Sequence, residues 1–151
     1  MSEVRGVLDT NVVLSARRSA NPRSAAHELL ARCRAGEWTL LYSRDVFLEY
    51  AEKLSGLGAE RGKIVEFITL LTALGVEVMI EYFHLRHYPS DSDDTAFLLC
   101  AWNGAASHLA SFDHHLLNLA SSYRGAFDIC RLRQMLEAVR ASRETGLPGT
   151  E

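Results

Sequence analysis

The sequence predicts an α/β domain in which a central, mostly parallel sheet of five strands lies between two layers of helices. Short apolar segments alternate with amphipathic segments of helical spacing, a pattern typical of parallel sheets covered on both faces. The 151 residues also suit a single domain. We expect this domain to span residues 1–141 and to be followed by a disordered tail at 142–151, which contains Gly and Pro.

The first part of the chain contains two expected strands, separated by a loop and a helix. Val4–Leu8 is apolar and indicates a buried strand, whereas the polar stretch Ser15–Arg23, which includes an Asn-Pro pair, indicates a loop. Ser24 is a typical N-cap for a helix that ends at Gly36. Residues 38–42 are expected to form the second strand.

Helices and strands continue to alternate through the rest of the chain. Ser43 is expected to cap a helix that ends near Gly56 or Gly58, and apolar residues at helical spacing between Ile64 and Leu74 predict another helix before Gly75. The remaining expected elements are a strand at 76–80, a turn at 88–94 leading into a helix closed by Gly104, a strand at 107–112, a short helix at 114–119, a strand at 126–129 and a helix at 132–139.

Composition limits the class of protein. Hydrophobic residues make up 48% and charged residues 23% of the chain, and no apolar run is long enough to cross a membrane. The first residues lack the pattern of a secretory signal, so we expect a soluble, cytoplasmic protein. Cys33, Cys100 and Cys130 have no paired spacing and are expected in apolar packing. The net charge of −3 argues against a tight, non-specific DNA binder.

Basic residues are unevenly distributed, because all but Lys53 and Lys63 are arginines. Arg17, Arg18 and Arg23 follow the first strand closely. A guanidinium group binds phosphate with two parallel hydrogen bonds, so these three arginines are candidate contacts to a nucleic-acid backbone. A solvated charged surface is the equally open alternative for each of them.

Four acidic residues are expected at one edge of the sheet. Asp9 and Asp113 directly follow the first and fourth strands, whereas Glu49 and Asp94 lie near the starts of helices that follow turns or strands. Ligands of open α/β sheets bind beyond the carboxyl ends of the strands. We therefore expect the four carboxylates to converge there.

Converging carboxylates predict a hard divalent cation, because without one they would repel each other and take up protons. Mg²⁺ and Mn²⁺ prefer oxygen ligands and can promote phosphodiester hydrolysis by activating a bound water. Asp9, which is followed by the polar Thr10 and Asn11, is the strongest single candidate. An acid at a helix start is often only a cap, and this interpretation competes for Asp94 and its neighbours.

Four segments carry a resemblance to a known family. They are residues 7–12 (VLDTNV), 43–50 (SRDVFLEY), 91–98 (DSDDTAFL) and 111–117 (SFDHHLL). In the order and spacing of these segments the chain resembles PIN-domain ribonucleases, and among them the toxin components of toxin–antitoxin systems, the VapC-like proteins. The resemblance runs from about Val4 to about Val139.

The resemblance implies a PIN-like fold and a catalytic metal site. Its catalytic and metal-binding residues would be Asp9, Glu49, Asp94 and Asp113, with Asn11 and Ser111 as supporting polar groups. Thr10, Asp93 and His115 are further candidate supporting residues because they lie next to these acids in the sequence. The resemblance also implies Mg²⁺ or Mn²⁺ as cofactor and single-stranded RNA as substrate. Arg17, Arg18 and Arg23, which follow the first strand closely, are the candidate contacts to this RNA. The expected protein is a homodimeric endoribonuclease that is inhibited by a separately encoded antitoxin.

The last segment departs from the family pattern at two positions. Phe112 stands where a Gly is common, and His115 stands where an Asp is common. His115 could leave a second metal weakly held or act as a proton carrier, although a structural or solvent-facing histidine is the competing interpretation. Asp93 competes with Asp94 for the same role, and the spacing to the following apolar residues favours Asp94.

Two other functions remain open on the sequence. A phosphatase or phosphoacceptor domain also places Asp after its first strand, but Asn11 occupies the position of a second acid and no lysine follows Val65. Trapping of an acyl phosphate on Asp9 would support that function. A catalytically weak or inactive PIN-like module that binds RNA or dimerises is the non-enzymatic alternative, which the changes at Phe112 and His115 make possible.

Overall fold

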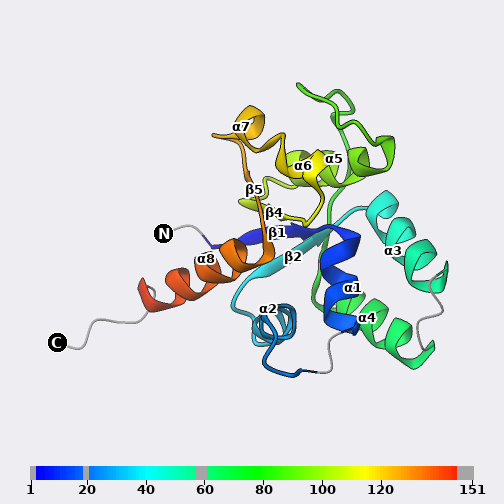
Figure 1. Cartoon of the computed structure of the whole chain (residues 1–151), viewed down its shortest axis with the longest axis vertical. Helices are drawn as coiled ribbons and strands as arrows, with labels where there is room; N and C mark the ends of the chain where they lie inside the picture. Colours follow the sequence, from blue (N-terminus) through cyan, green and yellow to red (C-terminus); the bar gives the residue numbers. More distant parts are fainter. Residues whose placement is uncertain (1–2, 19–20, 57–60, 146–151) are drawn as a thin grey trace.

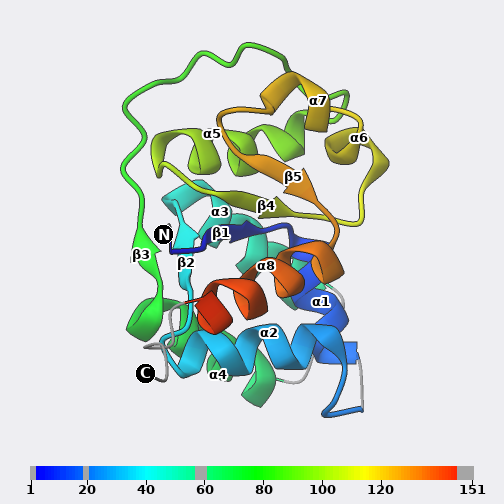
Figure 2. The ribbon, with the colours of Figure 1, turned by 90° about the vertical axis from the view of Figure 1, so that its left-hand side faces the viewer.

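The computed structural model describes residues 3–18, 21–56 and 61–145. Its centre is a sheet in which every pair of neighbouring strands is parallel. The strands are β1 (Arg5–Leu8), β2 (Thr39–Tyr42), β3 (Val76–Glu77), β4 (His108–Ala110) and β5 (Asp128–Cys130), in the spatial order β3-β2-β1-β4-β5 (Figures 1 and 2).

The strand order contains one reversal of direction. From β1 the chain adds β2 and β3 on one side, and it then returns across the sheet to place β4 on the other side of β1. Leu8 pairs with Ala110, and Ala110 pairs with Cys130, so the carboxyl ends of β1, β4 and β5 are aligned. A crevice between β1 and β4 at this edge is where open α/β sheets bind their ligands.

Helices cover both faces of the sheet. They are α1 (Thr10–Arg18), α2 (Ala25–Arg34), α3 (Arg44–Gly56), α4 (Arg61–Leu74), α5 (Thr95–Asn103), α6 (His114–Leu117), α7 (Ala120–Tyr123) and α8 (Leu132–Thr145), with a short 3₁₀ turn η1 (Ser92–Asp94) before α5. Helix α5 contacts β1, β2 and β4 on one face, whereas α8 lies on the opposite face with α2 packed against it (Figure 2). The predicted three-layer α/β/α fold is confirmed.

The core lies on both sides of the central strands. Val7, Leu40 and Leu109 are fully buried, as expected for strands covered on both faces. The three cysteines are buried free thiols, as predicted. No helix in the described part of the chain is both long and apolar enough to cross a membrane.

One predicted loop is wrong, because Ser15–Arg18 belongs to helix α1. This helix begins directly at the end of β1, where the Asp9 side chain accepts a hydrogen bond from the Thr10 backbone N–H at 2.8 Å. Val12, Val13 and Ala16 are buried on one side of the helix. Their spacing is helical, but the polar residues from Ser15 onward favoured a loop in the sequence.

The predicted disordered tail also begins too early, because α8 continues to Thr145. Ser142 donates a hydrogen bond from its hydroxyl to the Val139 carbonyl at 2.8 Å, and Arg143 forms an ion pair with Glu37 at 3.3 Å. The rest of the predicted tail, residues 146–151, lies outside the described residues.

Several further elements differ in extent from the prediction, among them β4 (His108–Ala110 rather than 107–112) and β5 (Asp128–Cys130 rather than 126–129). Strand β3 covers only Val76–Glu77 rather than residues 76–80, and both of its residues are exposed at the edge of the sheet. The expected helix at 114–119 is α6 alone, and the unpredicted α7 follows it.

Candidate metal centre

Asp9 occupies the carboxyl end of the central strand β1. Its side chain is buried and accepts two hydrogen bonds, from the Thr10 N–H at 2.8 Å and from the Ser111 hydroxyl at 2.7 Å. Burial raises the pKa of Asp9, and the hydrogen bonds from Ser111 and Thr10 oppose this rise. Asp9 is thus fixed in orientation at the carboxyl ends of β1 and β4.

Ser111 links Asp9 to a second acid. It directly follows β4 and is fully buried, and its oxygen accepts a hydrogen bond from the Asp113 backbone N–H at 2.9 Å while its hydroxyl donates to Asp9. Asp113 is half-buried and caps helix α6, because its carboxylate accepts a hydrogen bond from the His115 N–H at 2.9 Å. One hydroxyl therefore contacts both the carboxylate of Asp9 and the backbone of Asp113.

Asp94 reaches the same place from the turn before α5. It is buried, whereas its neighbour Asp93 is exposed. The turn η1 is capped by Asp91, whose carboxylate accepts a hydrogen bond from the Asp93 N–H at 3.0 Å. The Oδ2 atom of Asp94 is buried without a hydrogen-bond partner in the described part of the chain.

Asp9, Asp94 and Asp113 together form a compact group of carboxylates. One oxygen from each lies within 4.8 Å of the others. Burial and the neighbouring carboxyl of Asp113 raise the pKa of Asp94 to about 8. Such crowding of buried carboxylates is unfavourable without a counter-charge, and a cation would supply both the charge and a partner for the unpaired Asp94 oxygen.

Glu49 lies near this group but is not one of the three. It is half-buried on α3, 3.9 Å from the Lys53 ammonium nitrogen. Burial raises the pKa of Glu49, Lys53 lowers it, and Asp93 and Asp9 raise it further. The structure therefore brings Glu49 into the electrostatic field of the cluster without placing its carboxylate in direct contact.

The remaining predicted residues are arranged around the cluster in different ways. The Thr10 hydroxyl is buried and, within the described residues, has no hydrogen-bond partner, whereas Asn11 is exposed in the first turn of α1. His115 is also exposed, and it is its backbone rather than its ring that contacts Asp113. Phe112 is 38% exposed, although it lies between Ser111 and Asp113 in the chain.

Of the three predicted arginines, Arg23 is the one whose side chain the structure describes. The side chains of Arg17 and Arg18 lie outside the described residues. Arg23 is exposed near the start of α2 and lines a shallow cavity together with Arg133 and Arg140. Arg131, which directly follows β5, was missed on the sequence although the rule that singled out Asp9 applies to it as well.

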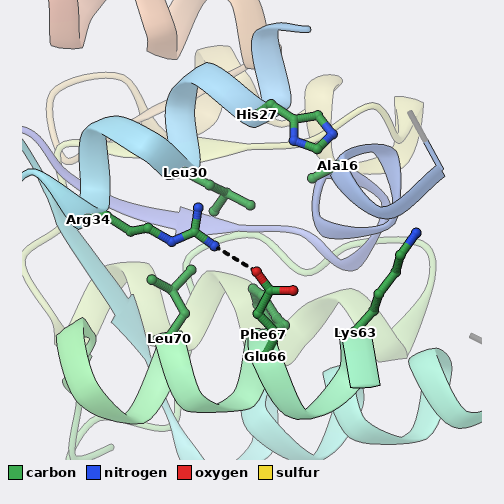
Figure 3. A pocket seen from close by; sticks show the side chains of 8 residues that line it. All are labelled: Ala16, His27, Leu30, Arg34, Lys63, Glu66, Phe67 and Leu70. Carbon is green, nitrogen blue, oxygen red and sulfur yellow. Dashed lines mark hydrogen bonds and ion pairs between the residues drawn. The ribbon is translucent and has the colours of Figure 1, made fainter. Parts of the chain in front are cut away.

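A separate pocket lies between helices α1, α2 and α4, and it contains none of the four acids (Figure 3). Leu30 and Phe67 form its apolar part, and an ion pair of 3.4 Å joins Arg34 on α2 to Glu66 on α4. The lining of this pocket is therefore apolar and ion-paired, and it differs from the group of carboxylates at the end of β1.

The fold and the cluster define an α/β protein with an acidic site at a topological switch point of its sheet. The PIN domain family model matches residues 5–115, and the chain belongs to this family. Among curated proteins none matches the chain significantly. PIN domains are typically nucleases, and the acidic cluster found here could bind a metal ion.

Proposed function

We propose that the protein is a metal-dependent endoribonuclease that hydrolyses RNA phosphodiester bonds through Asp9, Glu49, Asp94 and Asp113. The observation that carries this proposal is the approach of three carboxylates to within 4.8 Å at the switch point of a PIN domain. One of their oxygens, Oδ2 of Asp94, is buried and has no hydrogen-bond partner among the residues that the structure describes. A cation held at such a centre stabilises the negative charge that develops on a phosphate during hydrolysis.

The donor set fits Mg²⁺ or Mn²⁺. Asp9, Asp94 and Asp113 would hold the ion, and Glu49 would add negative charge at the rim of the site. When bound, such an ion lowers the pKa of its water and stabilises negative charge on the phosphate. All of the ligands are oxygen atoms, and no histidine or cysteine belongs to the group, which favours a hard cation over zinc.

The chain's own residues would orient this chemistry. Ser111 fixes Asp9 by donating a hydrogen bond to it and fixes Asp113 through its backbone N–H. The rear of the site is closed by buried groups, since Ser111 is fully buried and Asp9 is nearly so. Substrate would therefore approach from the side of Glu49 and Asp113, which are the more accessible acids.

Replacement of Asp9 by Asn tests the proposal. Asn keeps the size of the side chain but removes a charge that the cation needs, so we expect Mg²⁺- and Mn²⁺-dependent cleavage of single-stranded RNA to fall at least a hundredfold, roughly the loss of a few kcal/mol of transition-state stabilisation. Calorimetric titration with Mg²⁺ should show saturable binding to the unsubstituted protein and none to Asp9→Asn.

Asp128→Asn is the matched control, because Asp128 is an exposed acid at the opposite, amino end of the sheet. It should cleave RNA and bind Mg²⁺ like the unsubstituted protein. If Asp9→Asn cleaves RNA as well as Asp128→Asn and the unsubstituted protein do, the acids are wrongly assigned.

We further propose that the protein acts in the cytoplasm as the toxin of a toxin–antitoxin pair and forms a homodimer. Exposed apolar side chains support an interaction with another protein chain: Met79, Tyr82 and Phe83 are each at least 65% exposed. A small neighbouring gene for a DNA-binding protein whose product abolishes the RNA cleavage would support the toxin role. Full activity in the presence of that product would contradict it.

An inactive RNA-binding or dimerisation module is the second candidate. It is favoured by two observations, the separation of Glu49 from the three clustered acids and the position of His115, whose ring is exposed to solvent. Binding of single-stranded RNA without any cleavage across Mg²⁺ and Mn²⁺ concentrations would support this function over the nuclease.

A further inference from the structure

A cavity of about 480 Å³ opens at the same edge of the sheet as the acidic cluster. It is lined by Ser15 on α1, by the first residues of α2, by Phe112 and by residues 131–134 at the start of α8. Its size lies within the range of about 300–1,000 Å³ that is usual for small-molecule sites.

The wall of the cavity contains Phe112, which lies in the chain directly after Ser111 and before Asp113, and the strands β4 and β5 that end there are aligned. Ala110 on β4 pairs with Cys130 on β5, and the Ser111 N–H donates a hydrogen bond to the Cys130 carbonyl at 2.9 Å. Phe112 and Arg131 therefore leave the sheet side by side. Phe112 is also bounded in the chain by Ser111 and Asp113, which belong to the acidic cluster or support it.

The residues that line the cavity suit a nucleotide base. Phe112 is 38% exposed, and in the described part of the chain no aromatic ring stacks on it. An exposed aromatic ring beside a positively charged groove is the usual means by which proteins hold single-stranded nucleic acid. The cavity also has an apolar floor, formed by Ala26 and Leu132, which are both buried.

The cavity also provides positive charge. Arg131 and Arg133 are both exposed, and among the described residues no carboxylate pairs with either. By contrast, Arg140 on the same helix is already paired with Glu28. Gln134 accepts a hydrogen bond from the Arg131 N–H at 2.9 Å, which fixes the backbone at the start of α8.

We propose that this cavity is a nucleotide subsite for the RNA substrate, in which one base stacks on Phe112 and the adjoining phosphate binds Arg131 and Arg133. The proposal rests on the proposed ribonuclease function and adds to it a defined place for a nucleotide next to the scissile phosphate. It also gives Phe112 a role, at a position where the family pattern would have a residue without a side chain.

Binding of a short single-stranded RNA to Phe112→Ala, Phe112→Leu, Arg131→Gln and Arg133→Gln tests the subsite. Every protein also carries Asp9→Asn so that the RNA remains intact, and Arg124→Gln serves as a control of equal charge because Arg124 is exposed before the amino end of β5. The RNA carries the fluorescent base 2-aminopurine at one position at a time, and its emission falls when it stacks on an aromatic ring.

We expect Phe112→Ala and Phe112→Leu to weaken RNA binding about five- to a hundredfold and to restore 2-aminopurine emission at one position of the RNA. Removing the base at that position should cancel the difference between Phe112 and the two variants. Arg131→Gln and Arg133→Gln should each lower the salt dependence of binding by about 0.7 in the slope of log K against log salt, and Arg124→Gln should not.

Phe112→Leu preserves apolar packing, and thermal unfolding of each variant verifies the fold. Unchanged RNA affinity and emission in folded Phe112→Leu would overturn the subsite, and so would an equal loss of affinity in Arg124→Gln and Arg131→Gln. RNA cleavage by the protein with Asp9 intact reports separately on the ribonuclease. If that protein cleaves RNA while the Phe112 variants bind normally, the subsite alone is wrong, and if it neither binds nor cleaves RNA, both proposals are wrong.

Discussion

The proposed metal binding needs the charged form of Asp94, and this form is unfavourable in the ion-free fold. Burial and the nearby Asp113 raise its pKa to about 8 from an ordinary value of 3.8. A carboxyl with a raised pKa favours the folded state below its ordinary pKa and loses that contribution as the pH rises through its raised value. The ion-free domain is therefore destabilised at neutral and alkaline pH by a group that a cation would stabilise.

Replacement of Asp94 by Asn should stabilise the ion-free protein. The amide has nearly the same shape but no charge, so we expect the free energy of unfolding at pH 7 to rise by about 0.5–2 kcal/mol. The gain should increase between pH 5 and pH 8. Urea unfolding in the presence of a chelator measures it, and Asp93→Asn, at an exposed neighbour, is the control. A loss of stability in Asp94→Asn at all pH values would contradict the prediction.

Single positions were predictable where one rule decides their placement. Asp9 and Asp113 follow parallel strands, and the structure brings both to the same crevice. The spacing to the following apolar residues favoured Asp94 over Asp93, and the fold shows that Asp94 is buried whereas Asp93 is exposed. The distance of Glu49 from the cluster depends on how α3 docks, which spacing along the chain does not encode.

At the scale of elements, α3 is joined to the end of β1 by a buried hydrogen bond. Tyr50 is fully buried, and its hydroxyl donates to the Leu8 carbonyl, one residue before Asp9. The Tyr50 ring also packs edge to face against Phe67 of α4, with 5.4 Å between the two ring centroids. Because Glu49 is the neighbour of Tyr50, this contact sets where Glu49 lies relative to Asp9.

Tyr50→Phe should therefore lower the free energy of unfolding by about 1–3 kcal/mol, since it removes a hydrogen bond from a buried carbonyl. Tyr82→Phe removes a hydroxyl from an exposed ring and should change stability by less than about 0.5 kcal/mol. Chemical denaturation of both variants measures the difference. Equal effects would show that the Tyr50 hydroxyl does not hold the two elements together.

The succession of strands and most helices along the chain followed from the alternation of apolar and amphipathic segments, as Ser24 and α2 illustrate, whereas the spatial order of the strands came only from the structure. The Ser24 hydroxyl accepts a hydrogen bond from the His27 N–H at 3.3 Å, so this predicted cap is confirmed. Helix α1 was not predicted, because the polar residues among its buried Val12, Val13 and Ala16, and the Asn-Pro pair beyond it, favoured a loop.

At the scale of the whole molecule, the segment that leads from β3 back across the sheet towards α5 carries the exposed apolar side chains of Met79, Tyr82 and Phe83. Figure 2 shows this segment, after β3, as a long green connection without helix or strand. We expect Tyr82→Ser combined with Phe83→Ser to raise the dissociation constant of the proposed homodimer at least about tenfold, because both rings are exposed in the monomer.

Sedimentation analysis measures this dissociation constant, and Val65→Thr is the control, since Val65 is exposed on α4 and Thr has the same shape. A dimer that is equally stable in all three proteins would place the interface elsewhere. A monomer at every concentration would exclude the homodimer itself.

The hydrogen bond between Ser111 and Asp9 joins residues 102 positions apart in the chain. A ribosome releases the N-terminal part of a protein first, so Asp9 emerges long before β4 exists to pair with β1. Asp94 and Asp113 also come late. The acidic centre therefore cannot assemble before the segment that carries Ser111 and Asp113 has been synthesised.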